Sequence, residues 1–232
     1  MHNLLKGCIP RDHSRQVKLE TLVDALFRRE PSLLSVVDLG CGAGNSVDYF
    51  RRRRKDVRWT GVDIPDSPEA HARRRTDANF RFFDGVNIPL ADGEVDLFFC
   101  RQVLEHVKQP RELLRDVARC LRPGGYLAGS TSQFEPFHSY SLWNYTPYGI
   151  KTILDDVGLR LLEIRPGIDG ITLIARRGFG RRRCFSRWWV TESPLNRIIE
   201  AYARFRRMSP AATNALKLLF CGQFSFLARK PE

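Results

Sequence analysis

The sequence predicts an α/β protein built on a doubly wound, largely parallel sheet. Short apolar runs alternate with segments of helical periodicity over the first 170 residues, which is the rhythm of βαβ units. The run VDLFFC (95–100) is dominated by apolar side chains, as a strand covered on both faces must be. A length of 232 residues, 43% of them hydrophobic, is enough for one sizeable core. We therefore expect a single domain that spans residues 1–232.

The alternation assigns a structure to each segment in turn. Apolar runs predict strands at 35–40, 58–64, 80–83, 95–100, 126–131 and 159–164. Helical spacing predicts helices at 14–29, 45–55, 68–77, 110–121 and 147–157. The glycines of RPGG (122–125) are expected to form the C-cap of the helix before them. The closing segment QFSFLARK (223–230) alternates as a half-exposed strand does.

A basic segment interrupts this rhythm after residue 170. Ser193-Pro194 and Ser209-Pro210 each place an N-cap residue before a proline, which predicts the start of a helix. Residues 171–222 hold eleven Lys/Arg against two acids, a net charge of +9 out of +12 for the chain. We expect a helical insertion or lid here, called the basic insertion below. Its cations and aromatics favour an anionic acceptor, such as a nucleotide-linked or lipid-linked sugar, or a membrane surface. A merely solvated lid is the alternative.

The cysteines and the N-terminal segment indicate the cellular compartment. Six cysteines are scattered without paired spacing, which predicts reduced thiols and neither a disulfide framework nor a cysteine zinc site. The start MHNLLKGCIPRDH is too short and too polar for a signal peptide. No run approaches the ~18 apolar residues of a membrane span. We expect a cytoplasmic protein, with membrane association through the basic insertion as an option.

The stretch VVDLGCGAGN (36–45) carries the first functional signal. Gly40, Gly42 and Gly44 follow a strand directly, where an open α/β sheet binds its ligand. Asp38 would lie beside the pyrophosphate of a dinucleotide. Like charges ~4 Å apart repel by roughly 4 kcal/mol at an effective dielectric of 20. S-adenosylmethionine instead brings an ammonium and a sulfonium, which a carboxylate attracts, so the acid favours this cofactor over a nicotinamide dinucleotide.

Two further acids end the next two strands. Asp63 follows the second strand, where a carboxylate can accept hydrogen bonds from both ribose hydroxyls. Asp84 follows the third, where its side chain and the N–H of Gly85 could meet the adenine edge. Each acid alone could be a turn residue. Three acids at three successive strand ends favour a cofactor site.

Residues 36–131 resemble the class I S-adenosylmethionine-dependent methyltransferases. VVDLGCGAGN resembles their first motif, GVDI their ribose-binding strand end and FFDG their adenine site. The segments IPLADGEVDLFFCRQVLEHV and LRPGGYLAGST resemble their fourth and fifth strands. The resemblance implies a Rossmann-like, seven-stranded sheet whose last strand, 223–230, is antiparallel and lies between strands five and six. The cofactor contacts that we expect are Asp38, Gly40, Cys41, Gly42, Asn45, Asp63, Ile64, Asp84, Gly85 and Arg101.

Two histidines are candidates for acid–base chemistry. Glu105 and His106 in LEHV are similar to part of a metal-binding Glu-x-x-Glu-His set in ubiquinone-pathway and small-RNA methyltransferases. Gln102 stands where the first glutamate should be, so we expect no metal. The aromatic segment FEPFHSYSLWNYTPYG (134–149) resembles loops of glycan-pathway and natural-product methyltransferases and carries His138. We expect His138, ahead of His106, to be the catalytic base; a packing role is the alternative.

The sequence therefore predicts a methyltransferase whose acceptor is a small-molecule hydroxyl on a glycan, a lipid-linked compound or a natural product. An RNA methyltransferase is the second hypothesis, favoured by the charge but without an added RNA-binding module. A non-catalytic subunit that keeps the fold for binding or scaffolding is the third. Intact cofactor acids argue against that third hypothesis.

Overall fold

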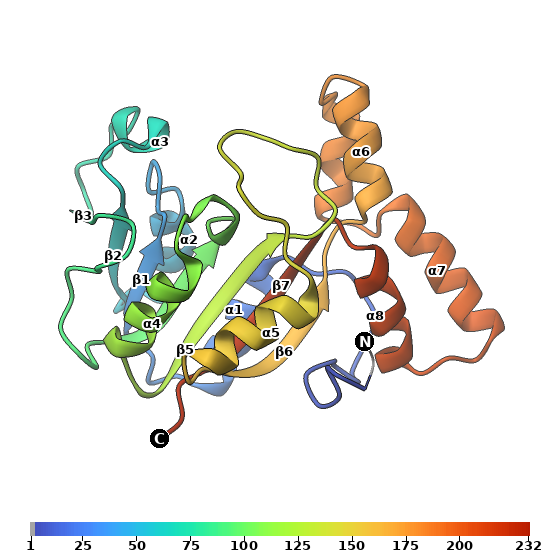
Figure 1. The fold of residues 1–232 in the computed structure, drawn as a ribbon, viewed down its shortest axis with the longest axis horizontal. Helices are drawn as coiled ribbons and strands as arrows, with labels where there is room; N and C mark the ends of the chain where they lie inside the picture. The colour runs from blue at the N-terminus through green and yellow to red at the C-terminus, as the bar shows by residue number, and fades with distance from the viewer. Residues whose placement is uncertain (1–2) are drawn as a thin grey trace.

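One seven-stranded sheet forms the centre of the molecule (Figure 1). The computed structural model describes residues 3–232. The strands follow the order β3-β2-β1-β4-β5-β7-β6, and β7 runs antiparallel to both β5 and β6. The strands are β1 (Ser35–Leu39), β2 (Arg58–Asp63), β3 (Asn79–Phe82), β4 (Val95–Arg101), β5 (Leu121–Ser132), β6 (Arg160–Pro166) and β7 (Gln223–Arg229). The predicted fold class, with its antiparallel last strand between the fifth and sixth, is confirmed.

Helices cover both faces of the sheet. They are α1 (Leu19–Arg29), α2 (Ser46–Arg53), α3 (Pro68–His71), α4 (Pro110–Cys120), α5 (Pro147–Asp156), α6 (Gly170–Gly178), α7 (Pro194–Phe205) and α8 (Pro210–Phe220). Two short 3₁₀ helices, η1 (Leu104–His106) and η2 (Arg183–Trp189), complete the described elements. Among residues 3–232 no helix is both long and apolar enough to cross a membrane.

The alternation of side chains along each strand divides the core into two layers. Leu97 and Phe99 of β4 pack with the apolar faces of α1 and α2. Phe98 and Cys100 point the other way, into the layer formed with α4, α5 and α8. This period of two is the geometry of a strand that is buried on both faces. It explains why β4 carries almost no polar residue.

Two predicted helices are shorter than expected. The helix predicted at 14–29 begins only at Leu19, because the chain before it is held extended by tertiary hydrogen bonds, such as Val17 N–H to the Pro166 carbonyl. The helix predicted at 68–77 ends at His71. Beyond it, Arg73 donates to the Gly42 carbonyl and Arg75 pairs with Asp48. These tertiary contacts hold Arg73 and Arg75 outside the helix that the local sequence pattern predicts.

The expected glycine C-cap is also wrong. Helix α4 ends at Cys120, and its C-cap Leu121 is already extended. Gly124 has a positive φ of 73°, which turns the chain inside RPGG rather than at the end of the helix. Strand β5 therefore starts earlier than predicted, with a register irregularity against β4.

Helices α6, α7, α8 and η2 lie between β6 and β7 and make up the basic insertion. The two Ser-Pro starts are confirmed, since α7 begins at Pro194 and α8 at Pro210. Helix α6 and η2 were not predicted. Lys217 of α8 is fully buried and ties the insertion together: its ammonium pairs with Glu200 at 2.7 Å and Glu192 at 2.9 Å, and donates to the Ser14 carbonyl.

The contact between β5 and β7 yields a prediction of stability. A Cβ at Gly129 would lie 2.2 Å from the buried Phe226 ring, whereas a Cβ at Gly178, in the last turn of α6, meets nothing within 4 Å. Gly129→Ala should lower the free energy of unfolding by about 1–3 kcal/mol through overpacking. Gly178→Ala should leave it unchanged or raise it slightly. Urea unfolding measures both, and equal stabilities would contradict this packing.

Candidate active site

The glycine loop joins β1 to α2 at the carboxyl end of the sheet (Figure 1). Gly40, Gly42 and Gly44 all have positive φ, of 67°, 51° and 77°, a region that side chains with a Cβ rarely adopt. A Cβ at Gly40 would come within 2.5 Å of Val103. One at Gly44 would come within 2.7 Å of the Phe80 ring. Side chains at Gly40 and Gly44 would therefore clash with the chain that packs against the loop.

Asp38 lies directly beneath this loop. Its side chain is almost completely buried and accepts a hydrogen bond from the hydroxyl of Ser46. Burial raises the pKa of Asp38 to about 7, against the lowering effects of the Ser46 hydrogen bond and of the nearby Arg101 charge. A carboxyl so desolvated gains from any cation placed beside it. This is the electrostatic setting that an ammonium or sulfonium requires.

Asp63 closes the other side of the loop. It ends β2, is buried, and its carboxylate accepts the N–H of Gly42 at 2.6 Å and that of Ile64 at 2.8 Å. Each oxygen of a carboxylate has further acceptor capacity. Asp38 and Asp63 therefore flank one glycine loop, as the sequence predicts.

Asp84 follows β3 and makes local hydrogen bonds. It is exposed, and it accepts the backbone N–H groups of Val86 and Asn87 together with the Asn87 side-chain amide. These hydrogen bonds lower the pKa of Asp84. The carboxylate thus caps its own turn. The expected contact of Asp84 and Gly85 with adenine stays a prediction.

The remaining predicted cofactor residues surround the loop at different depths. Cys41 is buried, and its sulfur lies 3.6 Å from the guanidinium of Arg73. Asn45 is exposed at the start of α2. Arg101, at the end of β4, pairs with Glu20 of α1 at 2.9 Å.

Sequence reasoning missed one element of this region, the segment after α3. Arg73 donates to the Gly42 carbonyl at 2.9 Å, and its guanidinium lies 4.0 Å from the centre of the Phe80 ring. The side chain of Glu69 comes within 3.1 Å of where a Cβ of Gly42 would be. This segment covers the glycine loop. Its charged sequence predicted a solvated helix and gave no sign of this contact.

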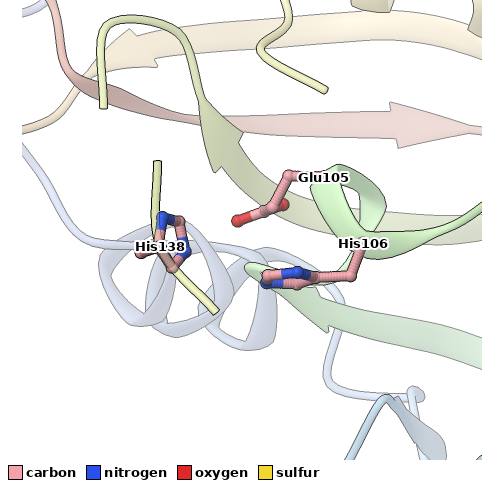
Figure 2. Close-up of side chains that lie close together, drawn as sticks. All are labelled: Glu105, His106 and His138. Carbon is pink, nitrogen blue, oxygen red and sulfur yellow. The ribbon is translucent and has the colours of Figure 1, made fainter. Parts of the chain in front are cut away.

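A second group of polar side chains lies at the ends of β4 and β5. Glu105 and His106 come from η1, and His138 comes from the loop after β5 (Figure 2). Their ligand atoms all lie within 4.8 Å of one another, so the three could hold a metal ion. Gln102, at the place of a fourth ligand, contributes a neutral amide. The rings of His106 and His138 meet edge to face with centroids 5.4 Å apart.

Glu105 is the buried member of this group. The Thr131 hydroxyl donates to it at 3.0 Å, and burial raises the pKa of Glu105 to about 7. The amide of Gln102, oriented to satisfy its neighbours, donates to Glu105 at 3.0 Å. Gln102 has a φ of 55°, a strained backbone for a residue with a Cβ and one that often marks a functional site. Burial also lowers the pKa of His106, which favours the neutral imidazole.

His138 has an acidic neighbour, Glu135, in the same aromatic segment. Its Nδ1 lies 3.8 Å from a carboxylate oxygen of Glu135. The other Glu135 oxygen accepts hydrogen bonds of 2.6 Å from Ser132 and from Gln223. A carboxylate fixed in this way can orient an imidazole and stabilise its protonated form. Tyr145, from the same aromatic segment, is buried and donates to the Leu104 carbonyl, which is a structural role.

A cavity of about 280 Å³ lies at the carboxyl ends of β4 and β5, where Arg101 and Gln102 line it. Glu20 lines it from α1 and Gln223 from β7, while Trp189 of η2 closes one side. Gln223 also touches Glu135. The walls carry both polar and apolar side chains and include Trp189 of the basic insertion. The volume is sufficient for a small polar molecule.

Comparison with known proteins identifies the family. A model described as a methyltransferase domain matches residues 37–129. An uncharacterized methyltransferase of Mycobacterium leprae (strain Br4923) is 31% identical over 186 residues, 70% of this chain and 67% of that protein. Another from Mycobacterium sp. (strain JLS) is 36% identical over 129 residues, 53% of this chain and 50% of that protein. A ubiquinone biosynthesis O-methyltransferase of Acinetobacter baylyi is 29% identical over 111 residues, 44% of each chain. The chain thus spans about half the length of several curated relatives that it matches.

Solved structures share the fold at low identity. The [4+2]-cyclase SpnF has a TM-score of 0.58 at 17% identity, covering 100% of this chain and 94% of its own. A 1,6-didemethyltoxoflavin-N1-methyltransferase of Burkholderia thailandensis, solved with S-adenosylhomocysteine, has a TM-score of 0.52 at 16% identity, covering 92% and 79%. Fold and relatives together define a class I methyltransferase. The chain belongs to the methyltransferase family, in the group whose cofactor is S-adenosylmethionine.

The buried acids at the glycine loop, Asp38 and Asp63, fit a cofactor that carries positive charge. The raised pKa of Asp38 makes this fit testable. A bound cation favours ionised Asp38, so below pH 7 binding must release its proton. Affinity for S-adenosylmethionine should fall up to about tenfold per pH unit between roughly pH 7 and pH 5. Asp38→Asn should bind more weakly at neutral pH and lose this dependence. Calorimetry across this range measures it.

Asp48→Asn is the matched control, because Asp48 is an exposed acid of α2 paired with Arg75. It should keep the slope of the wild-type chain. A wild-type affinity that stays constant from about pH 5 to pH 7 would contradict the role assigned to Asp38.

Proposed function

We propose that this chain transfers the methyl group of S-adenosylmethionine to a hydroxyl of a small molecule and forms a methyl ether. The observation that carries the proposal is the Glu135–His138 pair, which follows the carboxyl end of β5. Only β4 separates β5 from β1, whose carboxyl end carries the glycine loop. A hydroxyl acceptor must lose a proton as it attacks, and a positioned histidine is the commonest general base. The O-methyltransferase of Acinetobacter baylyi among the relatives supports an oxygen acceptor.

In this proposal the residues of the chain align the acceptor and move one proton. When bound, S-adenosylmethionine supplies an electrophilic methyl group on a sulfonium. His138 takes the hydroxyl proton as the acceptor oxygen attacks, and Glu135 holds the imidazole in place. His106, whose pKa is lowered by burial, serves as a neutral neighbour. Alignment at the edge of a dry core contributes much of the acceleration.

The acceptor that we infer is small and anionic or lipid-linked. The cavity beside Arg101 and Trp189 has the volume for a small polar molecule, and the basic insertion borders it. The reduced cysteines, five of them buried and Cys184 exposed, support our proposal of a cytoplasmic setting. We infer that no metal takes part, since Gln102 brings a neutral amide where a second acid would strengthen a cation site.

RNA methylation is the second candidate, and the net charge of +12 is the observation that favours it. A scaffold role is the third. The intact acids around the glycine loop argue against a scaffold role, because a subunit without a cofactor has no need of a carboxyl as desolvated as Asp38.

The position of the methyl group tests the proposal. The chain would be incubated with methyl-labelled S-adenosylmethionine and, separately, with phenolic acceptors, nucleotide-linked sugars, lipid-linked sugars and total RNA. We expect label in a small-molecule or lipid fraction that survives alkali, as a methyl ether does and a methyl ester does not. Label confined to RNA would replace the proposal with the second candidate.

The base yields a further prediction. With an accepted hydroxyl compound, His138→Ala should lower turnover by about 100-fold or more, because a general base contributes 10²–10⁴-fold. Affinity for S-adenosylmethionine should stay nearly unchanged. His71→Ala, at an exposed histidine of α3, is the control and should keep full turnover, and His106→Ala should lose less than His138→Ala.

The same assay separates the base from a metal centre. Chelators should leave turnover intact. Loss of activity with EDTA and its return with a divalent ion would instead assign Glu105, His106 and His138 to a metal site. Near-normal turnover of His138→Ala would leave this histidine as a packing residue.

A further inference from the structure

Helix α7 presents an apolar stripe to solvent. Ile198, Tyr202 and Phe205 are 65%, 50% and 83% exposed, and their spacing along the helix puts them on one face. The opposite face packs inward through Asn196 and Ile199. The helix lies at the outer edge of the molecule, away from the sheet (Figure 1). Large apolar side chains gathered on one exposed helical face mark an interaction surface.

The charge around this stripe has one sign. The only two acids of the basic insertion, Glu192 and Glu200, both turn inward to the buried Lys217. The ten other charged residues of the insertion are all arginines: 176, 177, 181, 182, 183, 187, 197, 204, 206 and 207. Within residues 3–232 none of these arginines forms an ion pair, whereas arginines of the sheet domain such as Arg53 and Arg119 do. The outer surface of the insertion is therefore purely cationic.

The root of the insertion meets the loop that carries His138. A Cβ at Gly170, the first residue of α6, would lie 2.7 Å from that of Phe134 and 3.5 Å from the Phe220 carbonyl. Phe134, Phe137 and Tyr140 of the loop are themselves exposed. Exposed apolar groups thus continue from the insertion to the rim of the candidate active site.

We propose that the basic insertion binds the surface of an anionic membrane. The apolar stripe of α7 lies in the headgroup region, and the surrounding arginines contact lipid phosphates. An apolar stripe flanked by cations is the pattern of a helix that lies in the interface plane, and arginine is suited to phosphate by its fork of donors. The inference rests on the proposed function in one respect, because membrane binding would bring a lipid-linked acceptor to His138 only if the chain methylates such an acceptor.

The stripe favours lipid over RNA. The side chains of Ile198 and Phe205 have no hydrogen-bonding group with which to recognise a base. Both would lose contact with water on entering a bilayer, which is favourable in proportion to their apolar area. Nucleic-acid affinity would depend on arginine–phosphate contacts and on bases stacked on Tyr202 or Phe205. Loss of Ile198, which provides neither, would leave it unchanged but would weaken binding to a bilayer.

Flotation of the full chain with vesicles tests the proposal. Vesicles containing phosphatidylglycerol should bind the chain, and vesicles of phosphatidylcholine alone should bind it much more weakly. Phe205→Ser should reduce binding at least tenfold, whereas Leu4→Ser, at an exposed leucine outside the insertion, should not. Arg204→Glu should reduce binding more than Arg52→Glu, an equally exposed arginine of α2, because each cation near an anionic surface adds to affinity.

Three outcomes overturn the proposal: equal binding to both kinds of vesicle, no binding to either, or binding to anionic vesicles that Phe205→Ser leaves intact. Binding of a single-stranded RNA that displaces the chain from vesicles and is insensitive to Ile198→Ser would assign the arginines to nucleic acid instead. The vesicle assay needs no methyl transfer. If the chain binds vesicles but methylates no hydroxyl, the proposed function is contradicted and the proposal of membrane binding by the basic insertion is still supported.

Discussion

The burial of Asp38 under the glycine loop is the constraint on which the site depends. An acid removed from water beside the end of β1 has a pKa near 7 and is stabilised by a cation beside it. The positive φ values of Gly40, Gly42 and Gly44 and the hydrogen bond from Gly42 to Asp63 shape the backbone around this charge. The same arrangement disfavours a pyrophosphate, since a second anion would meet an already desolvated carboxyl. The choice of cofactor thus follows from one electrostatic fact.

A second buried charge organises the other half of the molecule. Lys217 draws Glu192 and Glu200 inward and holds the chain at Ser14. The inward turn of both acids leaves the arginines unopposed outside, while Trp189 closes the cavity beside Gln102. One ion cluster thereby holds the basic insertion together and leaves its outer charges with a single sign.

The sequence was sufficient for features set by local chemistry. The strand positions followed from apolar runs, and the place of the last strand followed from the resemblance. Asp38 and Asp63 lie where their strand-end positions predict. What escaped prediction depends mostly on contacts between distant segments. Arg73 left its predicted helix for the Gly42 carbonyl, 31 residues away. The pairing of Lys217 with Glu192 and Glu200 also required the folded chain, because nothing in the sequence pattern brings these residues together. The contact of Glu135 with His138 is local, at a spacing of three residues, and its signal lay in the sequence.

Calorimetric titration with S-adenosylmethionine and with NAD tests the central claim most directly, since the claim is that buried acids at the glycine loop select a cationic cofactor. The account predicts saturable binding of S-adenosylmethionine and no detectable binding of NAD. Asp63→Ala should then weaken S-adenosylmethionine at least tenfold, because hydrogen bonds to a charged group contribute ~1.5–3 kcal/mol each. Tight binding of NAD without binding of S-adenosylmethionine would contradict the account.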